Sequence, residues 1–199
     1  MKFKDTIYGD LTDKIFVGSI NVSGMELTSL EGSPKVVING NFDCSYNQLT
    51  SLVDSPEIIR GHFNCSSNKL STLEYSPQEI DGSYMCYDNQ LVSLKGSPRE
   101  IKSGFFCGMN QLTSLEHSPT KIDGNFNAST NQITTIKYAP SEIGGGFFCS
   151  DNPNPYLEEE YKARQENPNL SDNEFNLLMY EITECTDYLP VDAQEMFLF

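Results

Sequence analysis

Apolar and polar residues alternate along a short segment that recurs through most of the chain. In residues 59–66 the small or apolar residues and the polar residues fall on opposite sides: Ile59, Gly61, Phe63 and Cys65 against Arg60, His62, Asn64 and Ser66. Such alternation, rich in aromatic and branched side chains, predicts a β-strand with one buried face. A Ser-Pro pair then predicts a turn in each copy, because proline fixes its own φ and restricts the residue before it.

The segment returns with a period of 21 residues. Proline keeps this spacing from Pro34 to Pro140, apart from one interval of 22. The asparagine column is Asn47, Asn68, Asn89, Asn110, Asn131 and Asn152. The cysteine column is Cys44, Cys65, Cys86, Cys107 and Cys149, with Ala128 in the one remaining slot. One copy is too small to fold alone, so we expect stacked copies that pair their strands in parallel about 4.8 Å apart around a continuous core.

The pattern therefore predicts a repeat solenoid, a parallel β-strand array of about seven rungs with a C-terminal helical cap. An N-terminal cap segment would occupy residues 1–15, the solenoid residues 16–155, and an acidic helical C-terminal cap residues 156–199. Atypical first and last rungs are expected of a capped array.

Two helical patterns follow Pro155. The first covers about residues 156–166. The second begins with the capping-box pattern Ser171-x-x-Glu174 and places on one face Phe175, Leu178, Met179 and Ile182. We expect these helices to cover the last open strand edge.

Residues 44–52 and 107–115 read Cys-Ser-Tyr-Asn-Gln-Leu-Thr-Ser-Leu and Cys-Gly-Met-Asn-Gln-Leu-Thr-Ser-Leu. They resemble leucine-rich repeats, most closely the short-period type of bacterial and tailed-phage proteins, and the resemblance extends over about residues 16–152. It implies that the column asparagines turn inward and pair with backbone groups. It also implies an interaction scaffold, here a phage-type host-takeover or counter-defence factor. Phe and Cys replace the two leucines that the strand of a leucine-rich repeat usually carries. A nearly straight β-solenoid is therefore as compatible with the sequence as a deep horseshoe.

Charge narrows the possible partners. The chain carries 28 acidic and 13 basic residues, a formal net charge of -15. This charge disfavours direct nucleic-acid binding and an anionic membrane surface. No apolar run reaches the length of a membrane span or of a signal peptide, so we expect a cytoplasmic protein, in the host cytoplasm if it is phage-encoded.

Residue types that carry chemistry form no catalytic pattern. The column cysteines would spread along a line instead of converging on a metal ion, so we interpret them as reduced structural thiols, and Cys185 lies outside the array. His62 and His117 lack a triad partner, and Gly144–Gly146 opens no helix. We expect no catalytic, cofactor or metal site, and hence no enzyme.

The outward strand columns predict a protein-binding surface instead. Apolar side chains interrupt otherwise polar positions at Met85, Tyr87, Phe106, Met109 and Phe148. Exposed aromatic and methionine side chains in a polar surround are typical of binding hot spots. Coverage of these residues by the C-terminal helices or by a second copy is the alternative.

The favoured function is thus non-catalytic binding of another protein, such as a host or defence protein. Residues 151–199 hold 12 acidic and 2 basic residues, which suggests as an alternative a nucleic-acid-mimicking inhibitor. The apolar segment Glu195–Phe199 would dock on the cap or mediate self-association, the third possibility being a structural component of a larger assembly.

Overall fold

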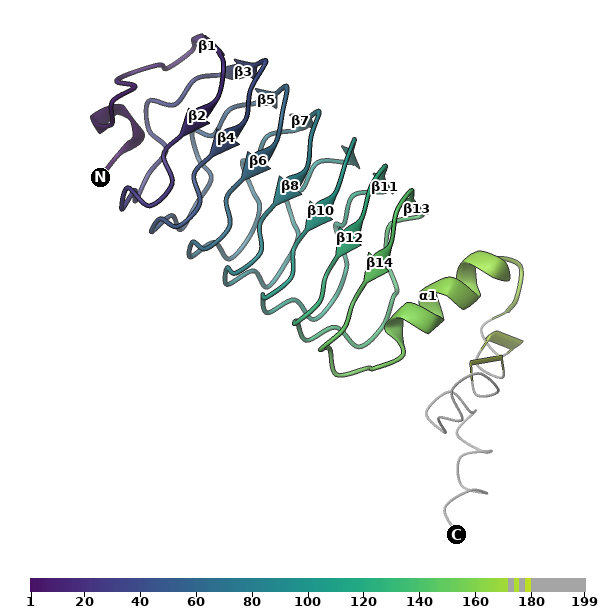
Figure 1. The fold of residues 1–199 in the computed structure, drawn as a ribbon. Helices are drawn as coiled ribbons and strands as arrows, with labels where there is room; N and C mark the ends of the chain where they lie inside the picture. Colours follow the sequence, from purple (N-terminus) through teal and green to yellow (C-terminus); the bar gives the residue numbers. More distant parts are fainter. Residues whose placement is uncertain (172–173, 176–177, 180–199) are drawn as a thin grey trace. The chain divides into compact units, whose positions relative to one another are not determined.

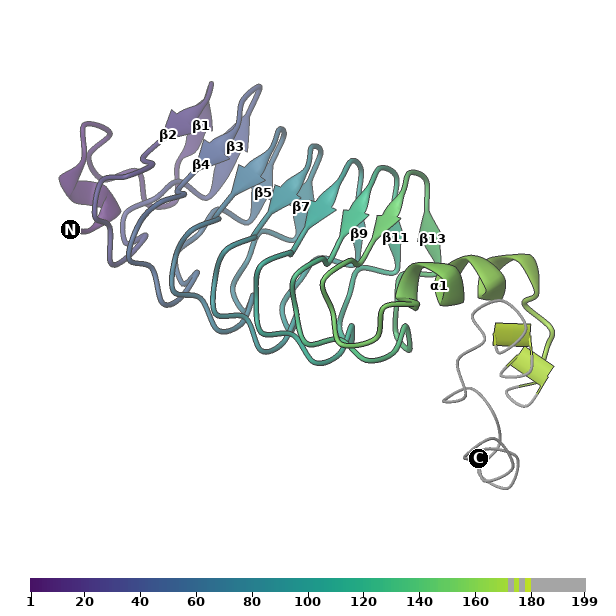
Figure 2. The same ribbon diagram turned by 60° about the horizontal axis from the view of Figure 1, so that its bottom comes forward.

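The computed structural model describes residues 1–171, 174–175 and 178–179 of the 199-residue chain. The chain separates into two units, Met1–Pro153 and Asn154–Phe199, and each is described by itself. The first unit is a parallel β-solenoid whose rungs follow one another along a common axis with little curvature (Figures 1 and 2). The predicted repeat solenoid is confirmed.

One sheet runs the whole length of the solenoid. Its seven parallel strands are β2 (Ile20–Asn21), β4 (Phe42–Asp43), β6 (Phe63–Asn64), β8 (Tyr84–Met85), β10 (Phe105–Phe106), β12 (Phe126–Asn127) and β14 (Phe147–Phe148). Seven strands in this order correspond to six full turns of the chain, with neighbours paired 21 or 22 residues apart.

A second side of the solenoid is also β-structure, divided into two sheets. The four-stranded sheet contains β1 (Ile15–Val17), β3 (Val36–Ile38), β5 (Ile58–Ile59) and β7 (Glu79–Ile80). The three-stranded sheet contains β9 (Glu100–Ile101), β11 (Lys121–Ile122) and β13 (Glu142–Ile143). Ladder pairing is therefore interrupted between β7 and β9.

Each rung carries two short strands, where the alternation predicted a single longer one. The chain turns a corner between β5 and β6, so Ile59 and Phe63 belong to different sheets. Gly61 stands at this corner, and a Cβ there would lie 2.2 Å from the carbonyl oxygen of Gly40. Successive backbones approach too closely for a side chain, which explains the glycine and the bend.

The core consists of side-chain columns that run along the axis. The aromatic rings from Phe42 to Phe147 lie 5.1–6.1 Å apart between centroids, within the range of favourable ring contacts. The cysteines of the repeat are free and fully or almost fully buried. Burial raises the pKa of the Cys65 thiol to about 12.

The asparagine column staples successive rungs together. Asn110 Oδ1 accepts a hydrogen bond from the Leu91 N–H of the preceding rung at 3.0 Å. Its Nδ2 donates to the carbonyl oxygens of Cys86, Cys107 and Gly108 at 3.0–3.1 Å. The same arrangement recurs at every asparagine of the column from Asn47 to Asn152, so each amide satisfies buried backbone groups of two rungs.

Residues 1–8 cover the first rung at β2 and at the segment that follows it. A 3₁₀-helix, η1 (Phe3–Asp5), buries Phe3 completely and stacks its ring on Phe42 at 6.0 Å. The ring thus extends the aromatic column past the smaller Ile20. The Tyr8 hydroxyl accepts a hydrogen bond from the Asn21 N–H at 3.0 Å, which satisfies a donor on the edge of β2.

The second unit contains α1 (Leu157–Glu166). Beyond it, Ser171 and Glu174 form the predicted capping box, with Ser171 N donating to Glu174 Oε2 at 2.9 Å. Phe175 and Met179 are buried against Ala163, with Leu178 packed beside them. Ile182, Cys185 and Glu195–Phe199 lie outside the described residues.

Candidate functional site

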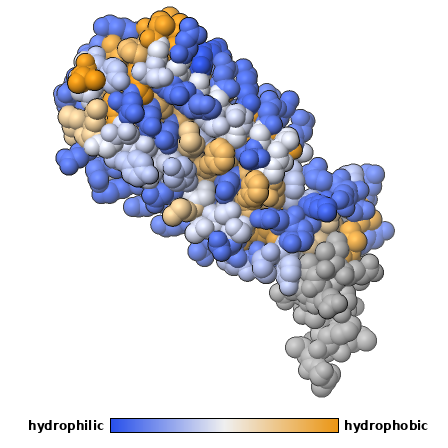
Figure 3. All heavy atoms as spheres, in the orientation of Figure 1, coloured by the Kyte–Doolittle hydropathy of each residue, from blue (hydrophilic) through white to orange (hydrophobic). Residues whose placement is uncertain are grey.

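The outward face of the seven-stranded sheet is built from three columns of side chains. The central column contains Asn21, Asp43, Asn64, Met85, Phe106, Asn127 and Phe148, which the strand register brings side by side. The other two columns are formed by the residues two positions before and two positions after each central one. We call the three columns together the strand face. Figure 3 views it directly and shows apolar side chains gathered along its middle.

The polar side chains of the central column accept hydrogen bonds from residues two positions later in the same rung. Asp43 Oδ1 accepts hydrogen bonds from Ser45 N at 2.9 Å and Ser45 Oγ at 2.6 Å. Asn64 and Asn127 accept the N–H of the residue two positions later in the same way, at 3.1 and 2.9 Å. The repeat thus has a standard residue for this position, an Asp or Asn that closes a local turn.

Three rungs carry an apolar side chain at this position and therefore lack the local hydrogen bond. Met85 and Phe106 are half-buried neighbours on β8 and β10, and Phe148 is 44% exposed on β14. Neither a thioether nor a phenyl ring can replace the carboxyl or amide acceptor of the other rungs. Met85, Phe106 and Phe148 therefore lack this local hydrogen bond and add apolar area to the strand face.

The two phenylalanine rings lie over glycines of the preceding column. A Cβ at Gly104 would lie 2.5 Å from Phe106 Cε2, and one at Gly146 would lie 2.6 Å from Phe148 Cζ. Other rungs carry Asn41, His62 or Ser83 at this position. The glycines leave room for the rings to lie flat on the sheet, where they present a broad apolar surface.

The other two residues predicted for this surface lie beside the central column. Tyr87 is half-buried, two positions after Met85. Met109 is 56% exposed in the turn after β10, with a left-handed φ of 55°. The structure therefore brings Met85, Tyr87 and Phe106 together and places Phe148 two strands farther along.

His62 belongs to a second ladder on the same face. Its Nδ1 accepts the Ser83 N–H at 2.8 Å, and its own N–H donates to Asn41 Oδ1 at 2.9 Å. These bonds tie one rung to the next, so the imidazole has a structural partner. His117 is exposed in a turn with φ of 68°, far along the chain from His62.

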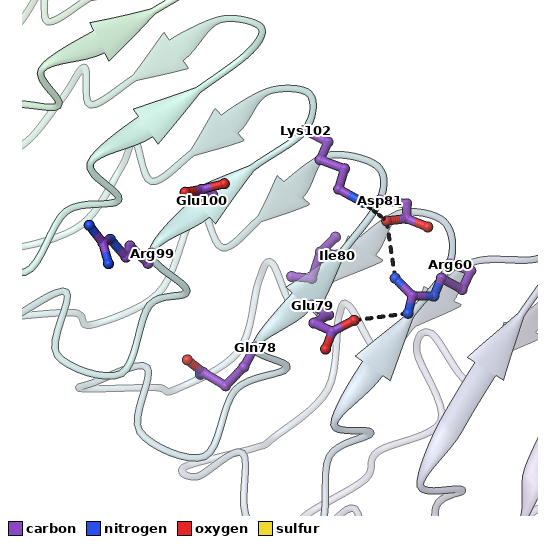
Figure 4. A pocket seen from close by; sticks show the side chains of 8 residues that line it. All are labelled: Arg60, Gln78, Glu79, Ile80, Asp81, Arg99, Glu100 and Lys102. Carbon is purple, nitrogen blue, oxygen red and sulfur yellow. Dashed lines mark hydrogen bonds and ion pairs between the residues drawn. The ribbon is translucent and has the colours of Figure 1, made fainter.

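Charge is segregated between the two sides of the solenoid. On the strand face Asp43 is the one carboxylate, and no lysine or arginine occurs there. On the second side, next to the corner, Arg60 contacts Glu79 and Asp81 at 2.8 and 3.3 Å, and Lys102 contacts Asp81 at 2.6 Å (Figure 4). Depletion of charge together with Met and Phe distinguishes the centre of a protein interface from ordinary surface.

Several depressions mark the surface of the solenoid, among them one of about 320 Å³ lined by Glu31, Lys35 and Glu57. One of about 340 Å³ opens where pairing is interrupted between β7 and β9, and the Arg60 and Lys102 ion pairs line it (Figure 4). Its charges largely neutralise one another. Another of about 210 Å³ lies on the strand face beside Met85, with Asp43 and Asn64 in its lining.

Sequence reasoning missed a second apolar surface at the first rungs. Ile15 and Val17 of β1 are 66% and 65% exposed, and Val36, Ile38 and Ile58 continue their columns on β3 and β5. Their alternation with buried residues was visible in the sequence. The alternation alone did not show which of these residues would face solvent.

Within the described ranges no three His, Cys, Asp or Glu side chains gather as a metal ion requires. No helix in that part of the chain is both long and apolar enough to cross a membrane. The acidic residues of the second unit include Glu158, Glu159 and Glu160 in the first turn of α1. No known protein family, curated protein or solved structure matches the chain.

Proposed function

We propose that the chain is a non-catalytic binding protein that recognises another protein through the strand face. The observation that carries the proposal is the replacement of Asp or Asn by Met85, Phe106 and Phe148 on a sheet otherwise almost free of charge. Each replacement gives up a local hydrogen bond and exposes apolar surface to water. A partner that covers this surface would recover the hydrophobic free energy.

The resemblance of residues 44–52 and 107–115 to short leucine-rich repeats supports the same function. It leads us to propose a leucine-rich-repeat-like scaffold that acts in the cytoplasm of a bacterial host and modulates a host protein. This part of the proposal depends on the resemblance alone.

The test uses Phe106→Asn with Phe148→Asn, because asparagine is the residue that the repeat itself places in this column. The new amides can close the local turn as Asn64 and Asn127 do, so the fold should be kept. Val92→Asn is the matched control, since Val92 is 56% exposed and lies outside the strand face.

Affinity capture from bacterial lysate, quantified by mass spectrometry, should retain one stoichiometric protein on the wild type and on Val92→Asn but not on the double variant. Retention by all three would exclude the strand face. If that retention also fell steeply between low and moderate salt, the acidic second unit would become the leading surface.

A second candidate function, self-assembly, is favoured by the open edge of β1. Ile15 and Val17 lie on an edge strand, and exposed apolar edges are templates for pairing with another chain. Light scattering after size exclusion should then show a concentration-dependent dimer that Val17→Lys abolishes. A monomer at all concentrations would rule this candidate out.

A further inference from the structure

We infer that the partner presents an amphipathic, basic α-helix that lies across the strands along the central column of the strand face. This inference rests on the proposed function and specifies the class of partner. The reasons are the saturation of the sheet's backbone groups, the spacing of the apolar side chains and the position of the charges.

Backbone pairing on the strand face favours a helix over an extended segment. Tyr84 N donates to Gly104 O at 2.9 Å, Cys86 N to Phe106 O at 2.9 Å and Phe105 N to Asn125 O at 2.8 Å. These N–H and C=O groups are therefore already paired with neighbouring rungs. A segment lying on the face must bring its own backbone groups already paired, as a helix does and an extended strand does not.

The spacing of the apolar residues fits the helical rise. Met85 and Phe106 are one rung apart and Phe148 lies two rungs farther, which at about 4.8 Å per rung places them at about 0, 5 and 14 Å along the axis. A helix advances about 1.5 Å per residue, so residues i, i+3 and i+10 fall at about 0, 4.5 and 15 Å on one side.

An extended strand would place same-side residues at about 0, 7 and 13 Å, which misses Phe106 by roughly 2 Å. A helix of the opposite direction would give apolar residues at i, i+7 and i+10. Either pattern is specific enough to be recognised in a set of unrelated ligands.

Charge adds a further position to the pattern. Asp43 lies two rungs before Met85, about 10 Å along the axis, which corresponds to helix position i-7. Its Oδ1 is taken by Ser45, whereas Oδ2 has no hydrogen bond to the described residues, and the 210 Å³ depression beside it has space for a long side chain. No basic residue of the strand face competes, and the net charge of -15 favours a basic partner at long range. We expect Lys or Arg at i-7.

The experiment selects ligands without knowledge of the natural partner. Random peptides of about 20 residues, displayed on phage from one helix-biased and one unbiased library, are panned against the full-length wild type. Each enriched clone is then tested individually for binding to the Phe106→Asn, Phe148→Asn double variant. Thermal unfolding of the double variant checks that its fold is kept.

Enriched peptides should share apolar residues at i, i+3 and i+10 with Lys or Arg at i-7, or the reversed pattern, and should gain helical circular dichroism on binding. The double variant should weaken their affinity at least 30-fold, and Asp43→Asn roughly two- to fivefold. Asp43→Asn is matched, because asparagine keeps the acceptor for Ser45 as Asn64 does for Ser66.

Two other outcomes are distinct. Peptides that depend on Phe106 and Phe148 but alternate with period two, or show no period, would refute the helix and leave the strand face as the binding surface. Enrichment only of peptides indifferent to the double variant, or of none, would refute the proposed function together with the inference.

Discussion

Replacing Asn110 by alanine should destabilise the solenoid far more than the size of the side chain suggests. The Asn110 amide accepts from Leu91 N–H at 3.0 Å and donates to three carbonyl oxygens. After truncation the carbonyls keep other donors: Asn89 Nδ2 for Cys86, Asn131 Nδ2 for Cys107 and Asp88 N for Gly108. The buried Leu91 N–H loses its partner.

An orphaned buried donor costs about 1–3 kcal/mol, and the two net hydrogen bonds lost with Nδ2 add about 1 kcal/mol each. We therefore expect Asn110→Ala to lower the free energy of unfolding by about 3–5 kcal/mol. Gln111→Ala is the control, because Gln111 is exposed and its side chain makes no hydrogen bond to the described residues. It should change stability by less than about 0.5 kcal/mol.

Urea unfolding followed by circular dichroism measures both variants. If Asn110→Ala lay within about 1 kcal/mol of Gln111→Ala, the amide ladder would not be holding the rungs together. Asn110→Asp adds a sign test, since its carboxylate would face carbonyl oxygens and its folded pKa would rise above the unfolded value of about 3.9. That variant should approach the wild type at low pH and lose stability as pH rises through the folded pKa.

Three further predictions concern the core and the charged side of the solenoid. The Tyr84 hydroxyl is buried and makes no hydrogen bond to the part of the chain that the structure describes, so Tyr84→Phe should raise stability by about 1 kcal/mol in the same urea assay; a loss would show that the hydroxyl is paired. Burial raises the Cys65 pKa to about 12, so iodoacetamide at pH 8 should leave this thiol unmodified in the folded protein and label it in urea, as peptide mass spectrometry can show. Rapid labelling without urea would contradict its burial. The hydrogen bond from Lys102, with the charges of Lys102 and Arg60, holds the Asp81 pKa below its usual range. The Asp81 carboxylate therefore contributes to the free energy of unfolding above its unfolded pKa, and this contribution is lost as pH falls through the folded pKa. Asp81→Asn should accordingly make the free energy of unfolding fall less steeply at acid pH. An unchanged slope would count against the network.

The repeat columns account for most of what could be foreseen. Phe63, Cys65 and Leu70 recur at a fixed spacing, and all are fully buried. Periodicity could not show that Ile59 and Phe63 belong to different sheets, because alternation continues through the corner at Gly61. Nor could it show that Phe3 would extend the aromatic column, since Phe3 lies outside the repeat.

The candidate site was foreseen as a set of residues and not as a surface. The sequence aligned Met85, Phe106 and Phe148 in one column, because a fixed period places equivalent residues side by side. It did not show that the side chains of Asp43, Asn64 and Asn127 accept hydrogen bonds within local turns. The three apolar residues are exceptional because they cannot do so.

The sequence by itself determined the period, the parallel stacking and the inward columns, because each rung repeats one local solution to burying apolar side chains. Only the tertiary structure decided where the chain bends, which sheet carries the ion pairs and which apolar residues stay exposed. These features depend on distances between atoms of neighbouring rungs, such as the approach of Gly61 to Gly40 and the reach of Arg60 to Asp81. A one-dimensional pattern fixes which residues become neighbours, and packing decides what those neighbours do to one another.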